Sequence, residues 1–244
     1  MFTLEFIAVF TASMLACLVT TAGIYIIRKH ADWANRNVAY FICFAAGVLI
    51  SVSFLHIIPI SFGMSESAPT FLLVGFLGLY ITNRFVSVFV CNDPDRSVAT
   101  GIIPMIGIGL HSFIDGIIYS VTFNVSIFTG ILSAIGMVLH EFPEGVITFL
   151  LLERAGFSRK KSAILAFLSA ALTTPLGTLV SFPFINKIDR STLSVLLAAS
   201  AGALTYVGAS HLLPAVEKEN KKFSLFALGA GVMVAVVIVL SKGK

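Results

Sequence analysis

The apolar segments of this chain are long enough to cross a lipid bilayer, and they recur along its whole length. A helical span needs roughly 20 consecutive apolar residues. Charged residues make up only 11% of the chain, against roughly 25% in soluble domains, so these runs are not the core of a large soluble protein. The runs lie at about 4–27, 38–62, 69–90, 98–123, 128–152, 161–182, 191–216 and 223–241.

The runs predict an all-α integral membrane protein with eight transmembrane helices in a single domain, residues 1–244. The first run lacks the positive segment of a cleaved signal and is interpreted as a retained helix. With the N-terminus outside, 12 of the 16 basic residues fall in or beside cytoplasmic connections, so both termini are predicted to face out. These twelve are Arg28, Lys29, Arg36, Arg84, Arg96, Arg154, Arg159, Lys160, Lys161, Lys218, Lys221 and Lys222.

An internal repeat relates two of the predicted helices. Residues 45–59 align without gaps on 200–214, and under this topology the two helices run in opposite directions. The domain therefore divides into repeat 1 (about 4–90), a central pair of helices (about 98–152) and repeat 2 (about 161–241), a 3+2+3 inverted repeat typical of secondary transporters. The identical pairs are Ala46/Ala201, Gly47/Gly202, Leu49/Leu204, Val52/Val207, His56/His211 and Pro59/Pro214.

Two polar motifs interrupt the central helices, HSFIDG at 111–116 and HEFPEG at 140–145. Ionisable groups at membrane depth are costly and indicate a functional site. His111 lies about 20 Å from the inner end of its helix, and His140 about 18 Å from the outer end of the next. In a core of roughly 30 Å, the two motifs share a depth.

The spacing of the motifs predicts a cation site. His111 and Asp115 are four residues apart, as are His140 and Glu144, so each pair projects from one helix face. Two imidazoles and two carboxylates suit zinc, with iron, manganese, cobalt and cadmium as alternatives. The empty site is formally −2, so a divalent cation would neutralise it, and binding should weaken as pH falls. Glu141 is interpreted as a further ligand, a proton acceptor or a supporting carboxylate.

Other residues near the motifs have two interpretations. Ser112 is a ligand of a neighbouring site or a small packing residue. His56 and His211 are polar stations on either side of the central site, or interfacial histidines paired with nearby groups. Pro143 is predicted to break its helix and free a carbonyl, which is tolerated where the backbone lines a cavity. Pro175 is predicted to act likewise in the next helix.

The glycines of the two motifs and the net charge of the chain indicate how the helices pack and which partners to expect. Gly116 and Gly145 follow the two carboxylates and are predicted to allow close helix approach. The net charge of +4 lies in short connections without aromatic interleaving, so a nucleic-acid partner is not expected. The expected partners are a divalent metal ion and the lipid bilayer, and a homodimer is left open. The cation is expected to be cargo, with no cofactor.

The two motifs in successive helices, with eight helices arranged 3+2+3, resemble the ZIP (Zrt/Irt-like) family of divalent metal transporters. The resemblance implies both termini outside, a metal site between helices 4 and 5, and movement of zinc or a related cation toward the cytoplasm by alternating access. It maps a primary site to His111, Asp115, His140 and Glu144, and a second site to Ser112 and Glu141, with Asp115 and Glu144 bridging. Many relatives have Asn at Ser112 and Glu at Thr174, so the number of bound metals stays open.

A transporter is therefore the favoured function, in the inner membrane of a bacterium because the loops are short. The alternative is an integral-membrane metalloenzyme, since His-Glu-x-x-Glu at 140–144 is similar to the HExxH zinc helix. A metal sensor or structural metal protein is a third possibility. The inverted repeat favours transport, because it has no role in the enzyme interpretation.

Overall fold

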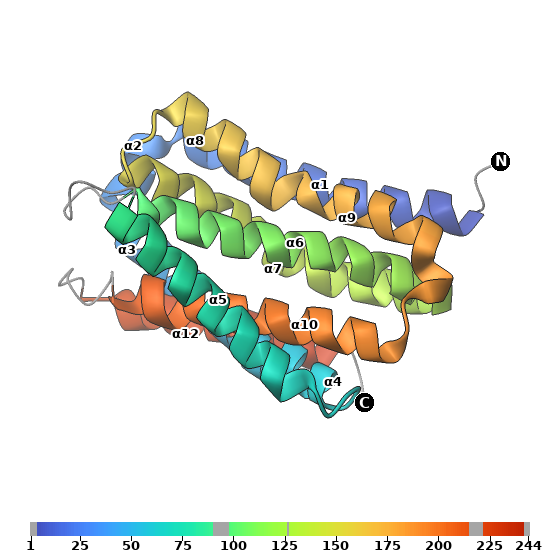
Figure 1. Cartoon of the computed structure of the whole chain (residues 1–244). Coiled ribbons are helices and arrows are strands. Elements are labelled where there is room, and N and C mark those ends of the chain that lie inside the picture. The colour runs from blue at the N-terminus through green and yellow to red at the C-terminus, as the bar shows by residue number, and fades with distance from the viewer. Residues whose placement is uncertain (1–3, 90–97, 126, 215–221, 242–244) are drawn as a thin grey trace.

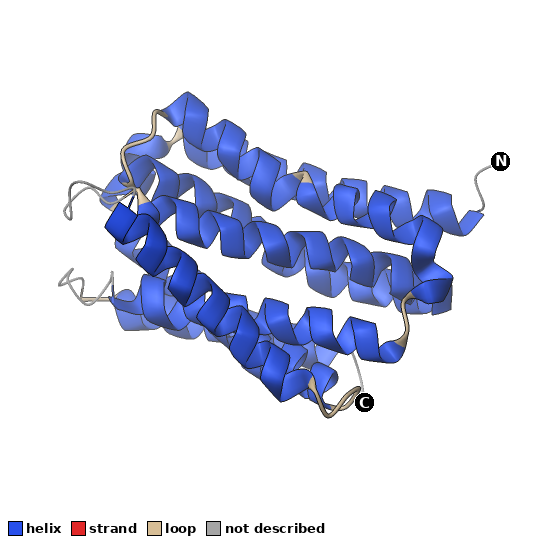
Figure 2. Ribbon diagram, viewed as in Figure 1, coloured by secondary structure: helices blue, strands red, loops and turns tan. Residues whose placement is uncertain are grey.

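The computed structural model describes residues 4–89, 98–125, 127–214 and 222–241, and within them helices account for nearly all of the chain (Figure 2). The long helices lie side by side in one bundle (Figure 1). In chain order they are α1 (Leu4–Lys29), α2 (Ala31–Arg36), α3 (Val38–Val52), α4 (Ile58–Phe62), α5 (Ala68–Phe89), α6 (Ala99–Val125), α7 (Ile127–Arg154), α8 (Arg159–Ala166), α9 (Thr173–Ser181), α10 (Arg190–Thr205) and α12 (Ser224–Ser241).

The apolar runs coincide with these helices to within a few residues. Among the described residues, five helical stretches are long and apolar enough to cross a membrane. The chain is therefore a multi-pass integral membrane protein, as predicted, while the count of eight spans stays a prediction. The five stretches are Leu4–Lys29, Val38–Phe62, Ala99–Asn124, Arg159–Ile185 and Arg190–Leu212.

Three of the described helical stretches contain a π-helical turn, and each turn precedes a proline. The turns are Ser53–Ile57, Phe167–Ala171 and Tyr206–Leu212. A proline cannot donate a backbone hydrogen bond, and its ring clashes with the carbonyl four residues back. A wider π turn relieves this clash, as the 2.8 Å bond from Leu172 N to the Phe167 carbonyl illustrates. The prolines that follow are Pro59, Pro175 and Pro214.

Pro143 behaves differently from these three prolines. α7 continues as an α-helix from Ile127 to Arg154 with Pro143 inside it, so the predicted break in this helix is wrong. α1 and α6 both pack along α7 and hold it in place. Neighbouring helices of this kind let a membrane helix tolerate a proline without unwinding. At Pro175 the predicted disturbance takes the form of the π turn that ends at Ala171.

A tight turn reverses the chain between α7 and α8. Gly156 has φ +94, a backbone conformation that favours glycine, and it ends α7. Phe157 N donates to the Leu152 carbonyl at 3.1 Å, which closes the end of that helix. Ser158 then accepts a hydrogen bond from Lys161 N at 3.4 Å and caps α8. α8 therefore folds back beside α7.

The first connection of the chain meets this turn at one end of the bundle (Figure 1). Arg159 pairs with Asp32 of α2 and also donates to Glu153 at 3.0 Å. Asn35 of α2 donates to the same glutamate at 3.0 Å. Two of the connections that were predicted to be cytoplasmic thus lie side by side.

The long helices form two groups, and within each group the helices pack on one another. One group consists of α3, α5, α10 and α12, in which α3 packs on α12 and α10 on α5. Gly47 of α3 lies against the backbone of Leu228, and Gly202 of α10 lies against the backbone of Leu72, so a Cβ at either position would clash. Gly47 and Gly202 are related by the repeat, and α3 and α10 run in opposite directions along the bundle (Figure 1).

The second group consists of α1, α6, α7 and α9, and it contains both polar motifs. α6 and α7 pack on each other, α1 packs on α7, and α9 packs on α6. Gly116 of α6 crosses α9 at Thr174 and Gly177, where only glycine leaves room for the backbone. Gly145 of α7 lies against Thr20 of α1. Both glycines therefore allow the close helix approach that was predicted.

Candidate metal centre

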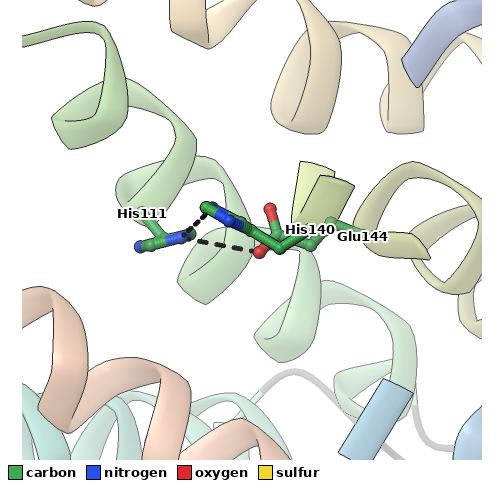
Figure 3. Close-up of side chains that lie close together, drawn as sticks. All are labelled: His111, His140 and Glu144. Carbon is green, nitrogen blue, oxygen red and sulfur yellow. Dashed lines mark hydrogen bonds and ion pairs between the residues drawn. The ribbon is translucent and has the colours of Figure 1, made fainter. Parts of the chain in front are cut away.

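The two polar motifs meet between α6 and α7, deep in the bundle. His111 and Asp115 lie one turn apart on α6, and His140 and Glu144 lie one turn apart on α7. The imidazoles of His111 and His140 and the carboxylate of Glu144 converge on one point (Figure 3). Their candidate ligand atoms all lie within 4.8 Å of one another. The two motifs therefore lie at the same level of the bundle, and their depth in the membrane stays a prediction.

Four of the distances between the donor atoms are close to those around a four-coordinate cation. Four ligands placed about 2.1 Å from zinc in a tetrahedron lie about 3.4 Å from one another. His111 Nε2 lies 3.3 Å from His140 Nε2, 3.5 Å from Glu144 Oε1 and 3.3 Å from Asp115 Oδ2. His140 Nε2 lies 2.9 Å from Asp115 Oδ2. His111, His140 and Glu144 converge closely enough to hold one divalent ion, and Asp115 lies beside both imidazoles.

The candidate ligands are shut off from solvent. The exposed fractions of His111, Asp115, His140 and Glu144 lie between 1% and 6%. Among the described residues, Glu144 Oε1 is a buried atom without a hydrogen-bond partner, which is costly in a protein interior. A divalent cation would compensate both this orphaned oxygen and the formal charge of −2 from the two carboxylates. The donor set therefore fits a cation bound in an occluded position.

Ser112 and Glu141 lie beside the four candidate ligands. The Ser112 hydroxyl donates to the Ile108 carbonyl at 3.0 Å and lies 3.5 Å from Glu144 Oε2. Glu141 is fully buried and accepts a hydrogen bond at Oε1 from the Thr174 hydroxyl of α9 at 3.3 Å. Its Oε2 has no hydrogen-bond partner among the described residues. Thr174 thus contacts the carboxylate of the second predicted site.

Ser200 is a contact of the site that sequence reasoning missed. Its hydroxyl lies 2.8 Å from His111 Nδ1, and it comes from α10, outside the two motifs. The only signal in the sequence was the repeat, where Ser200 aligns with Ala45. A hydroxyl in place of a methyl group at a repeat position is too weak a signal to predict a contact with a histidine.

His56 and His211 lie apart from the four candidate ligands. Both are half-buried, and both belong to the π turns before Pro59 and Pro214. His211 hydrogen-bonds to the backbone of Ala99 at the start of α6. Its ring lies 6.0 Å from the ring of Tyr206. A role for either histidine on a cation path stays a prediction.

The arrangement is unfavourable for hydrolytic chemistry. In an HExxH enzyme the glutamate after the first histidine activates a water molecule at the metal. Here the corresponding Glu141 directs one carboxylate oxygen to Thr174 of α9, and the candidate ligands are occluded. A catalytic metal needs an open position for water and substrate. The metalloenzyme interpretation is therefore not favoured.

Comparisons with known proteins agree with this geometry. The family model described as ZIP zinc transporter matches residues 91–237. The zinc transporter ZupT of Streptococcus mutans is 27% identical over 259 residues, which cover 95% of this chain and 96% of that protein. The zinc transporter ZupT of Chlorobium luteolum is 31% identical over 264 residues, which cover 97% of this chain and 98% of that protein. The resemblance seen in the two motifs thus extends over nearly the whole sequence, and the chain belongs to the ZIP zinc transporter family.

Proposed function

We propose that this chain carries zinc, or a chemically similar divalent cation, across the plasma membrane of a bacterium toward the cytoplasm. The observation that carries the proposal is the convergence of His111, His140 and Glu144 from α6 and α7, with Asp115 beside both imidazoles and all four side chains shielded from solvent. Zinc is the first candidate because its usual ligands match this set, and because the relatives are named zinc transporters. Iron, manganese, cobalt and cadmium remain alternatives.

The architecture that we propose for the membrane is eight helices in a 3+2+3 inverted repeat, with both termini outside. The matching glycine contacts of Gly47 and Gly202 support the repeat, as do the opposite directions of α3 and α10. The contacts among Asp32, Glu153 and Arg159 support a common side for two predicted cytoplasmic connections. The inverted repeat supports transport, because many carriers are built this way around a midplane site.

In the mechanism that we propose, the four ligands replace the water molecules bound to the cation, and the cation is then held in the occluded site. Because the ligands are buried, the cation can enter and leave only when α6 and α7 move relative to the helices that cover them. His56 lies toward the outer end of its helix and His211 toward the inner end, where they would serve as polar stations. The neutralised site passes through the apolar interior at a lower cost than the empty site with charge −2.

Glu141 and Ser112 have supporting roles in this proposal. The Thr174 hydroxyl holds one oxygen of Glu141, so this carboxylate serves as a support next to the four ligands. Ser112 donates to its own helix and fills the space beside Glu144. A second ion bound by Ser112 and Glu141 is left open, and so is a homodimer.

Flux of radioactive zinc into sealed vesicles containing the purified protein tests the proposal. Replacement of His140 or Glu144 by Ala should abolish the flux. His30→Ala and Glu66→Ala are matched controls because both side chains are exposed and lie outside the site, so their flux should equal that of the wild type. Normal flux through well-folded His140→Ala protein would refute the site. Saturable binding without flux would instead support a metal sensor or structural metal protein.

A further inference from the structure

Ser200 makes a hydrogen bond that singles out His111 within the candidate site. The Ser200 hydroxyl lies 2.8 Å from His111 Nδ1, while Nε2 of the same ring faces His140 and Glu144. Serine and histidine are both buried, so water does not compete for this bond. One edge of the imidazole is thus held by α10, and the other edge faces the position of the cation.

The chemistry of imidazole gives this bond a direction. A cation on Nε2 requires that nitrogen to be free of its proton, so the remaining proton is on Nδ1. Nδ1–H then donates to the Ser200 oxygen, which fixes both the tautomer and the orientation of the ring. Outer partners of this kind usually change metal affinity 10–100-fold. We propose that Ser200 is a positioning residue for the cation site, an inference that rests on the proposed function.

The internal repeat argues against a purely structural role for the Ser200 hydroxyl. The repeat-related residue is Ala45, which lies beside Pro143 and Glu144. A small side chain is therefore sufficient for packing at this position. Several buried or half-buried serines satisfy their hydroxyl on the previous turn of their own helix, as Ser53 does with the Leu49 carbonyl at 2.8 Å. The partner of Ser200 is instead an imidazole on another helix.

The bond also links the two packing groups of helices. His111 belongs to α6, which packs on α7 and α9, whereas Ser200 belongs to α10, which packs on α5. A displacement of α6 along α10 by even one residue, about 1.5 Å, removes the serine from hydrogen-bond distance. The imidazole is then free to rotate. Ser200 therefore gives the site its full affinity only in the arrangement of helices seen here, and movement between the groups weakens the hold on the cation.

Binding of cadmium ions to the full-length chain in detergent tests this role by calorimetry. Ser200→Ala should raise the dissociation constant roughly 10–100-fold while the number of bound ions stays the same. Ser194→Ala is the matched control, because Ser194 lies on the same helix, is equally buried, and donates to the Ser61 carbonyl at 2.8 Å. This control should bind cadmium as the wild type does. Unchanged affinity in Ser200→Ala, or an equal loss in both variants, would overturn the proposal.

A spectroscopic readout separates positioning from general damage. In cadmium-loaded protein labelled with ¹⁵N-histidine, the Nδ1 proton of His111 should exchange slowly with water in the wild type and in Ser194→Ala. It should exchange quickly in Ser200→Ala, and slow exchange there would contradict the proposal. His140→Ala distinguishes the two levels of inference. If His140→Ala binds cadmium normally, the proposed metal site itself is refuted. If His140→Ala loses cadmium binding while Ser200→Ala binds normally, only the role of Ser200 is rejected.

Discussion

Asp115 Oδ2 lies 2.9 Å from His140 Nε2 and 3.3 Å from His111 Nε2, so one carboxylate oxygen contacts both imidazoles of the site. The aspartate belongs to α6, and His140 belongs to α7. Asp115 therefore orients the histidine of the neighbouring helix as well as the one on its own helix. Asp115 contacts the Nε2 atoms, which face the position of the cation, whereas Ser200 contacts Nδ1 of His111.

The first prediction concerns the charge of this aspartate. Asp115→Asn keeps the shape of the side chain but reduces the formal charge of the empty site from −2 to −1. We expect zinc affinity to fall by at least the 10–100-fold that follows loss of an outer partner. Titration of the purified protein against a competing chelator measures the change. Glu66→Gln, which neutralises an exposed carboxylate, is the control and should leave affinity unchanged.

The second prediction concerns the hydroxyl that supports Glu141. Thr174→Val keeps the volume of the side chain but leaves Glu141 Oε1 without its 3.3 Å bond. An unsatisfied buried polar group costs about 1–3 kcal/mol, so the free energy of unfolding should fall by that amount. Chemical unfolding in detergent measures it. Thr173→Val is the control, because the Thr173 hydroxyl bonds to a carbonyl of its own helical stretch. Equal losses in the two variants would contradict a specific role for Thr174.

The third prediction compares two glycines of the same packing group. A Cβ at Gly47 would clash with the backbone of α12, whereas a Cβ at Gly229 meets nothing within 4 Å. Gly47→Ala should therefore destabilise the protein by about 1–3 kcal/mol, the usual cost of overpacking. Gly229→Ala should be neutral or stabilising, because alanine favours helix. Thermal unfolding of the two variants decides, and similar midpoints would argue against the close contact of α3 with α12.

The fourth prediction concerns the cap of α10 outside the apolar segments. Asp189 accepts a hydrogen bond from Thr192 N at 2.7 Å, and hydrogen bonds from the side chain and the backbone of Thr192 lower the pKa of the carboxyl group. A lowered pKa in the folded state stabilises the protein above the unfolded value of about 3.9, and the contribution is lost as pH falls through the folded pKa. The melting temperature of the wild type should therefore approach that of Asp189→Asn as pH falls from 6 to about 2.5. A constant difference between the two proteins over this range would contradict the prediction.

Local features of the sequence were sufficient for much of the fold and of the candidate site. Apolar runs of spanning length predict helices because the bilayer sets their length, and the observed helices match them within a few residues. The i, i+4 spacing in each motif predicts which side chains share a face. Equal depth then brings His111 and His140 together without knowledge of any other contact.

Features that depend on a third helix could not be predicted in this way. The contact of Ser200 with His111 depends on how α10 packs on α6, and no local pattern records that packing. The orientation of Glu141 toward Thr174 depends likewise on the crossing of α6, α7 and α9. The continuity of α7 through Pro143 follows from support by its neighbours rather than from the proline itself.

The π turns at Ser53–Ile57 and Tyr206–Leu212 have a mechanical consequence. In such a turn each backbone donor can exchange a carbonyl five residues back for one four residues back, so the number of hydrogen bonds is conserved while the helix changes length. Both helices of the repeat have such a turn at the repeat-related histidines, His56 and His211. We expect the π turn of each helix to convert to an α turn and back as the cation passes. This conversion would change the length of the helix without unfolding it.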